Sequence, residues 1–297
     1  MDQSPAVYIC IPVHNDVELT LKCLMSISRQ TYQNYTVVLV DDGSTDQTEE
    51  RVKKEFPKTV VLKGDGNLWW TGATALAVSY ALKNAAPEDC IYTLNNDTEL
   101  MENTLEKLVE AHRNHPKALI GTLNVVFEDK ETIELSAFSR QMGWPMKDRM
   151  KKLTLTQDSL PHHKDVLEVY ALSGKGVLVP VSVFEAIGNY NATDLPHYHA
   201  DTEFTIRAYR AGFKILLSTK ARLYSHHKRT GIGTRATQTT FHTFLESFRT
   251  LRSPHHLSSL TNFNKIIHGK WYQFYLMMDL FFITGGFLKR TIASPFK

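Results

Sequence analysis

Ile91-Tyr92-Thr93-Leu94-Asn95-Asn96-Asp97-Thr98 joins an apolar run, typical of a buried strand, to a short polar segment. Ligands of open α/β sheets bind just beyond the carboxyl ends of the strands, which is where this polar segment would lie. A carboxylate such as Asp97 can hold a divalent cation there, and the cation can hold a diphosphate. The alternative is a plain polar turn into a helix, with Thr98 as the helix N-cap.

The surrounding sequence alternates between strand-type and helix-type segments. Apolar runs end near His14, Asp42, Asp65 and Asp97, and each is followed by a segment with apolar residues at helical spacing. This order predicts an α/β fold with a Rossmann-like, mostly parallel sheet flanked by helices. Because the carboxyl ends of parallel strands meet at one edge, we expect the four polar loops to converge there.

The second half of the chain is less regular. We expect strands at 118–127, 170–180 (interrupted by glycines) and 214–224, helices at 181–187 and 202–211, and a basic loop at 147–160.

Residues 240–297 form an aromatic-rich, helical C-terminal extension with few acidic residues. Aromatic segments flanked by cations are typical of helices that lie on a membrane surface. The alternatives are a helical cap packed against the rest of the chain and the interface of a homodimer. No uncharged apolar run reaches the ~18 residues of a spanning helix.

Composition narrows the class of protein. The 297 residues are 42% hydrophobic and 22% charged, which indicates a globular protein. A net charge of +3 is too small to indicate a nucleic-acid partner. The three cysteines form no CxxC pair, and no secretory signal is visible at the amino end, so we expect a cytoplasmic protein.

Carboxylates in both halves are candidates for chemistry. Asp42 can accept hydrogen bonds from a nucleobase or ribose, and Asp97 is the candidate ligand for Mg²⁺ or Mn²⁺. Asp201 and Glu203 begin a predicted helix, where either could act as a general base, although the helix dipole alone would favour acidic residues there. The pair His226-His227 at a strand end is a candidate for a further metal ligand.

The chain resembles family 2 glycosyltransferases with the GT-A fold, particularly bacterial rhamnosyltransferase-like members, from about residue 7 to about residue 230. The matching motifs are Ile11–Asn15, Val40–Asp46, Gly66–Trp70, Leu94–Thr98, Val183–Gly188 and Ala200–Phe204 followed by Arg207-Ala208.

The resemblance implies a role for individual residues. The donor nucleotide and sugar would be held by Pro12, Val13, His14, Asn15, Asp42, Gly64, Asp65, Trp70, Asn95, Asn96 and Asp97. Asn96 and Asp97 occupy the family's metal motif, His226 or its neighbour His227 lies where some members have another metal ligand, and Asp201 occupies the position of the catalytic base. The chain departs from the family at Ala200, where a Glu is usual, and at Asn95, where a second carboxylate is common.

The implied activity is inverting transfer of a sugar from a nucleoside diphosphate, with UDP- and dTDP-sugars, dTDP-rhamnose included, as candidate donors. The acceptor would be a glycan or a polyprenyl-diphosphate-linked glycan of bacterial surface polysaccharide synthesis. The alternative is a non-catalytic protein that binds nucleotide sugars or glycans. Residues 1–239 would form the transferase domain, with 1–125 as its nucleotide-sugar-binding half and 126–239 as its acceptor half. The extension would contact the inner face of the plasma membrane.

Overall fold

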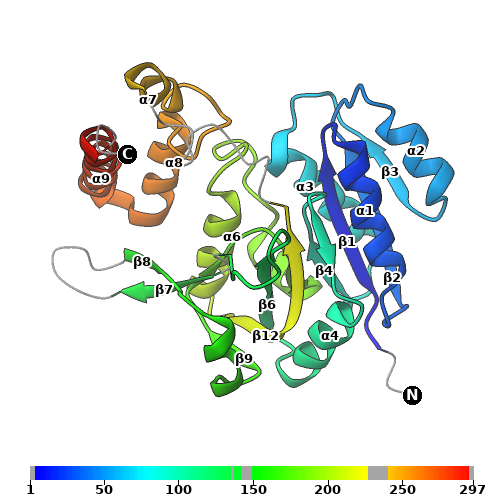
Figure 1. The fold of residues 1–297 in the computed structure, drawn as a ribbon. Helices are drawn as coiled ribbons and strands as arrows, with labels where there is room; N and C mark the ends of the chain where they lie inside the picture. Colours follow the sequence, from blue (N-terminus) through cyan, green and yellow to red (C-terminus); the bar gives the residue numbers. More distant parts are fainter. Residues whose placement is uncertain (1–3, 135–136, 142–148, 227–239, 294–297) are drawn as a thin grey trace.

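The computed structural model describes residues 4–134, 137–141, 149–226 and 240–293 (Figure 1). A mixed sheet lies between two layers of helices, and the C-terminal helices form a separate group beside α6 (Figure 1). The sheet strands are β1 (Val7–Val13), β2 (Tyr35–Asp41), β3 (Val60–Lys63), β4 (Cys90–Thr93), β5 (Thr98–Leu100), β6 (Ala118–Val126), β9 (Val166–Glu168), β11 (Val177–Pro180) and β12 (Lys214–Ser225). A small second sheet consists of β7 (Ala137–Gln141), β8 (Arg149–Lys152) and β10 (Ala171–Leu172).

The strand order of the main sheet is β3-β2-β1-β4-β11-β6-β12-β5, with β9 paired to β12. β3, β2, β1 and β4 are parallel, as are β6 and β12, whereas β11 is antiparallel to both of its neighbours. The predicted fold class, a mostly parallel sheet flanked by helices and followed by C-terminal helices, is confirmed. The parallel strands place the polar loops that follow them at one edge.

Both faces of the sheet are covered, which explains why its central strands β1, β2 and β4 are largely apolar. Ile9, Ile11 and Leu39 pack beneath one helical layer, while Cys10 and Val38 pack beneath the other. The first layer contains α1 (Val17–Ser28), α2 (Thr48–Glu55) and α4 (Thr104–Asn114), and the second contains α3 (Trp69–Asn84), α5 (Val181–Ile187) and α6 (Ala200–Arg210). The alternation of successive residues between two cores fixes the strand register.

Several boundaries differ from the sequence predictions. Pro12 and Val13 end β1 rather than begin a loop, paired with Val40 and Asp41. A proline is tolerated at this point because β4 pairs with β1 only as far as Cys10, so no partner on that side needs its missing N–H.

Thr98 does not cap a helix. It begins β5, which pairs with the end of β12, and its hydroxyl donates to the carbonyl of Asn95 over 2.6 Å. Likewise, the predicted basic loop contains β8, paired with β7, and a 3-10 turn at Gln157–His162.

The C-terminal extension consists of α7 (Phe241–Ser247), α8 (Leu257–His268), a 3-10 turn (Gly269–Trp271) and α9 (Tyr272–Ala293). Phe263 and Ile267 of α8 are buried in one cluster with Ile206 of α6, and Arg210 donates to the carbonyl of Ile267 over 2.7 Å. Helix α8 is therefore packed directly on the helix that begins with the candidate base. Within the described residues, no helix combines the length and apolarity that crossing a bilayer would require.

Candidate functional site

The loops that follow β1 and β2 are tied to each other. His14 Nδ1 lies 2.7 Å from the carbonyl oxygen of Asp42, and the side-chain oxygen of Asn15 accepts from the backbone N–H of Thr45 over 2.9 Å. Asn15 has a φ of 62°, a left-handed conformation that Asn tolerates better than most residues. The side chains of His14 and Asn15 thus help to fix the shape of the edge.

Asp42 braces the loop between β3 and α3. One of its carboxylate oxygens accepts from the N–H of Gly66 over 2.8 Å, and the other accepts from the N–H of Trp69 over 3.0 Å. A side chain at Gly64 could not be accommodated, because its Cβ would lie 2.4 Å from Asp42 Oδ1. With 4% of its surface exposed, Asp42 acts in this structure as an anchor for the loop that carries Asp65. Its contact with a ribose stays a prediction.

The segment Asn95–Asp97 lies at the end of β4 as expected. The side-chain oxygen of Asn95 accepts from the indole N–H of Trp70 over 2.8 Å, and the amide of Asn96 donates to the hydroxyl of Thr20 over 3.0 Å. Asp97 differs from both, because its Oδ1 is buried and has no hydrogen-bond partner. A buried carboxylate oxygen without a partner is costly, so this atom is the one at the edge that most needs a ligand.

A divalent cation fits Asp97 better than it fits His226. The two residues are neighbours, since the N–H of His226 donates to the backbone carbonyl of Asp97 over 3.0 Å. The imidazole, however, is 2.8 Å from the carboxylate of Glu99 and stacks on Phe127 with ring centroids 4.0 Å apart. No group of three or more metal-ligating side chains occurs among the described residues.

A cation beside Asp97 would therefore need ligands from its diphosphate, as Mg²⁺ usually does. His227, the alternative histidine of the sequence analysis, lies outside the described part of the chain.

Asp201 joins the second half of the chain to the edge. Its Oδ2 accepts from the N–H of Gly174 over 2.7 Å, and its Oδ1 accepts from the N–H of Thr202 over 2.7 Å. A Cβ at Gly174 would lie 2.6 Å from the ring of Trp70 and 3.1 Å from Asp201 Cβ. The missing side chain at Gly174 thus lets Trp70 and Asp201 approach each other.

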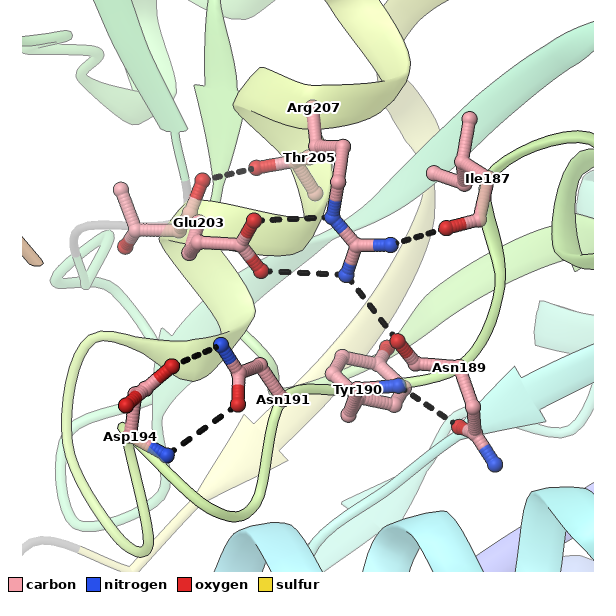
Figure 2. Close-up of polar contacts among 9 residues, drawn as sticks. Ile187, Asn189, Tyr190, Asn191, Asp194, Glu203, Thr205 and Arg207 are labelled. Carbon is pink, nitrogen blue, oxygen red and sulfur yellow. Dashed lines mark hydrogen bonds and ion pairs between the residues drawn. The ribbon is translucent and has the colours of Figure 1, made fainter. Parts of the chain in front are cut away.

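Glu203 has a structural role (Figure 2). It is 2% exposed, and its two carboxylate oxygens accept from Arg207 over 2.8 and 3.1 Å. Arg207 also donates to the backbone carbonyls of Ile187 and Asn189, so it ties the start of α6 to the chain that follows α5 (Figure 2). Of the two acids considered from the sequence, only Asp201 lies next to Trp70.

A histidine-rich segment before α6 connects the edge to the C-terminal helices. The ring of His197 lies 5.4 Å from that of Trp69, and burial lowers the pKa of His197 to about 4, assisted by Arg252. His199 Nε2 lies 2.8 Å from the carbonyl oxygen of Pro254 in the connection between α7 and α8, and burial lowers its pKa as well. Both imidazoles are therefore neutral near pH 7.

Two contributors to the site are absent from the sequence prediction. Gly174 supplies the N–H that orients Asp201, and Tyr190 packs its buried ring on Phe204 and against the edge of Trp70. The glycine break after Leu172 is the one signal in the sequence that could have indicated the first. Nothing in the local pattern around Tyr190 indicates the second.

Comparison with known proteins identifies the family. The family described as glycosyl transferase family 2 matches residues 8–168, which is more than half of the chain. An uncharacterized glycosyltransferase of Rickettsia typhi is 26% identical over 299 residues, which cover 96% of this chain and 82% of that protein. Glycosyltransferase GlyG of Streptococcus pneumoniae serotype 4 is 40% identical over 47 residues, a match that covers only 16% of either chain.

Solved structures share the fold at low sequence identity. GalNAc-T7, solved with UDP, GalNAc and Mn²⁺, has a TM-score of 0.64 at 16% identity over 93% of this chain; this chain spans 50% of that protein. TarS 1-349 of S. aureus has a TM-score of 0.54 at 16% identity over 96% of this chain and 81% of that one. At such identities the similarity concerns the fold, and it confirms the GT-A architecture. On the strength of the matched sequence motifs and this fold, the chain belongs to glycosyl transferase family 2.

Proposed function

We propose that this chain is an inverting glycosyltransferase that moves a sugar from a nucleoside diphosphate to a hydroxyl group of a glycan. Family membership supports a glycosyltransferase in general. The observation that carries the more specific proposal is the position of Asp201. Its carboxylate accepts from Gly174, which also lies beside the ring of Trp70, and Trp70 donates to Asn95 in the segment just after β4. A base and a diphosphate site at one edge are what a displacement at an anomeric carbon requires.

The donor would lie along the loops of the first half. The chain from Pro12 to Asn15 and the loop held by Asp42 would contact base and ribose, while Gly64, Asp65 and Trp70 would line the way to the sugar. Structures of the related fold were solved with UDP and with UDP-GlcNAc, which supports a UDP- or dTDP-sugar here. The rhamnosyltransferase-like motifs make dTDP-rhamnose one donor to test.

Mg²⁺ or Mn²⁺ would be held by Asp97 together with the phosphates of the donor, with His226 as a proposed further ligand. When bound, the cation would neutralise charge on the leaving diphosphate. Turning the imidazole of His226 toward the cation would require breaking its contact with Glu99.

Asp201 would act as the base. One carboxylate oxygen would take the proton of the acceptor hydroxyl while the hydroxyl oxygen attacks the anomeric carbon. The bond to the diphosphate breaks on the opposite side of that carbon, which inverts its configuration. The N–H groups of Gly174 and Thr202 would hold the carboxylate in place, so little reorganisation is needed in the transition state.

We assign the transferase role to residues 1–239, with the nucleotide sugar at 1–125 and the acceptor at 126–239. The acceptor would be a glycan or a polyprenyl-diphosphate-linked glycan, in bacterial surface polysaccharide synthesis in the cytoplasm. Residues 240–297 would form an extension that packs on the acceptor half.

Replacement of Asp201 by Asn tests the proposal. Because Asn keeps the size of the side chain but cannot take the proton of the acceptor hydroxyl, we expect Asp201→Asn to bind the donor as the unaltered chain does and to lose about 10²–10⁴-fold in turnover. Release of UDP or dTDP from matching donor sugars, in Mn²⁺ with a glycan mixture, measures turnover, and calorimetry measures binding. Glu185→Gln, an exposed change on α5, is the control. Turnover by Asp201→Asn equal to that of the unaltered chain would exclude Asp201 as the base. If the unaltered chain binds the donor but shows no turnover, the non-catalytic alternative is favoured.

A further inference from the structure

The C-terminal helices and the turns beside them carry most of the large hydrophobic side chains that are exposed in the described chain. Eight of the ten large hydrophobic side chains that are exposed in the described chain lie between Phe241 and Leu288. Met25 and Leu76, the other two, stand on separate helices of the transferase region. Single exposed hydrophobic residues are ordinary, whereas a group of them on one element indicates an interaction surface.

On α9 these residues form a stripe, which we call the outer stripe: Met277, Phe281 and Leu288. They are 60%, 68% and 52% exposed. Their spacings of four and seven residues place them on one side of the helix.

Other residues of α9 pack against α7 and α8. Phe287 is 6% exposed and stacks on Phe244 of α7 with ring centroids 4.3 Å apart. Asp279, the only acidic residue of α9, accepts from the side chain of Asn264 in α8 over 2.9 Å. The acidic group therefore faces the neighbouring helix, and the outer stripe carries no carboxylate.

The extension is also the cationic part of the chain. Residues 240–297 contain seven of the 34 Lys and Arg residues but only two of the 31 Asp and Glu residues. The extension thus has a net charge of +5, and the 27 basic and 29 acidic residues left in 1–239 give −2. Lys270, just before α9, and Lys289, near its C-terminal end, are exposed. Lys270 lies 6.0 Å from the ring centroid of the exposed Trp271.

We propose that the outer stripe rests on a lipid bilayer that contains anionic lipids, with α9 in the plane of the interface. Apolar side chains would enter the acyl boundary while Lys270, Trp271 and Lys289 contact the headgroups. A second copy of this chain fits the stripe less well, because a two-fold interface would bring the same uncompensated lysines together. The proposal does not rest on the transferase activity.

Binding of the full chain to vesicles tests the proposal. We expect the chain to co-sediment with phosphatidylcholine vesicles that contain phosphatidylglycerol at least about tenfold more strongly than with phosphatidylcholine alone, and to be released by high salt. The triple variant Met277→Ser/Phe281→Ser/Leu288→Ser should lose more than about tenfold in partition. Its control, Met25→Ser/Leu76→Ser, removes the two exposed large hydrophobic side chains of the transferase region, which are 44% and 37% exposed, and should bind as before.

A variant with fewer charges measures the electrostatic contribution to vesicle binding. Each cation near an anionic surface contributes about fivefold, so Lys270→Gln/Lys289→Gln should bind about 30-fold more weakly, whereas Lys22→Gln/Lys83→Gln should not. Sedimentation equilibrium of the same samples measures self-association. A dimer that the triple variant separates, together with no vesicle binding, would overturn the proposal in favour of an interface between copies. Absence of both, or equal binding to neutral and anionic vesicles, would also overturn it.

Discussion

At the edge of the sheet, the side chains of Asp42, Asn95 and Asp201 are hydrogen-bonded to the protein itself, whereas on α9 Met277 and Phe281 are more than half exposed. Asp97 at the edge keeps a carboxylate oxygen, Oδ1, buried without a hydrogen-bond partner. On the extension, the outer stripe leaves apolar side chains exposed. The two regions therefore ask for opposite kinds of ligand: a charged one at the edge and a hydrocarbon one at the extension.

The two regions should also differ in how much they contribute to the free energy of unfolding. Polar contacts at the edge and behind it hold the chain in one shape, so a change there should cost folding free energy. The outer stripe holds nothing in place, so a change there should cost binding alone. Helix α6 lies between the two regions, because it carries Asp201 in its first turn and packs against α8.

The largest effect on stability should come from Glu203→Gln. The carboxylate is 2% exposed and Arg207 is 28% exposed, so removing the charge leaves a poorly solvated guanidinium. We expect a loss of about 2–4 kcal/mol in the free energy of unfolding, somewhat below the usual loss for a broken buried pair because Arg207 keeps some water. Urea denaturation measures it.

An ion pair of the extension provides the matched control. Glu246 at the end of α7 and Arg249 in the turn after it also form an ion pair three residues apart but are exposed, so Glu246→Gln should change stability by less than about 0.5 kcal/mol. Equal losses in the two variants would contradict the contrast between the regions. Turnover per folded Glu203→Gln molecule should stay within about tenfold of normal, because this carboxylate does not take the proton.

Acidification should lower the stability of the segment before α6, which connects the sheet edge to the C-terminal helices. His197 has a pKa of about 4 when folded and the usual higher value when unfolded, so the unfolded chain binds more protons in between. The contribution of His197 to the free energy of unfolding is fully present above about pH 6.5. It decreases as the pH falls toward about 4, and about 2 kcal/mol of it is lost by pH 5.

Urea denaturation at pH 7 and pH 5 of the unaltered chain and of His197→Gln measures this contribution. The variant should lose about 2 kcal/mol less on acidification, while His242→Gln, at an exposed position of α7, should behave as the unaltered chain does. Identical pH dependence of His197→Gln and the unaltered chain would show that His197 is not held neutral by burial.

The smallest effect should come from the outer stripe. Phe281→Ser should change the free energy of unfolding by less than about 0.5 kcal/mol, because the ring is 68% exposed. Phe287→Ser on the packed side of the same helix should cost about 3 kcal/mol, because its ring is buried on Phe244. A large loss for Phe281→Ser would mean that the stripe is part of the folded core.

The sequence predicts those features that depend on local pattern. Alternating strands and helices gave the α/β fold, and polar residues after apolar runs gave the positions of Asp42 and Asp97. Local pattern could not tell which of Asp201 and Glu203 is structural. Glu203 is structural because it pairs with Arg207, and Arg207 is held by the carbonyls of Ile187 and Asn189, which only the folded chain brings near it.

Features that depend on which strands pair could not be predicted from the sequence. β5 lies beside the end of β12, and this antiparallel pairing brings Glu99 to the imidazole of His226. β8 pairs with β7 across residues 142–148, so its basic sequence forms a strand although its composition favours a loop. Neither contact follows from the periodicity of the segment concerned.

The most direct test of the central claim is the thermal stability of the full chain with UDP, dTDP, GDP or CMP, each with and without Mn²⁺. The claim is that a nucleoside diphosphate binds at the sheet edge with a cation on Asp97. One nucleotide should raise the unfolding temperature in the presence of Mn²⁺, by the equivalent of about 2.7 kcal/mol at a hundredfold excess over its Kd. Asp97→Asn should remove the dependence on Mn²⁺. No stabilisation by any of the four, with or without the metal, would contradict the claim.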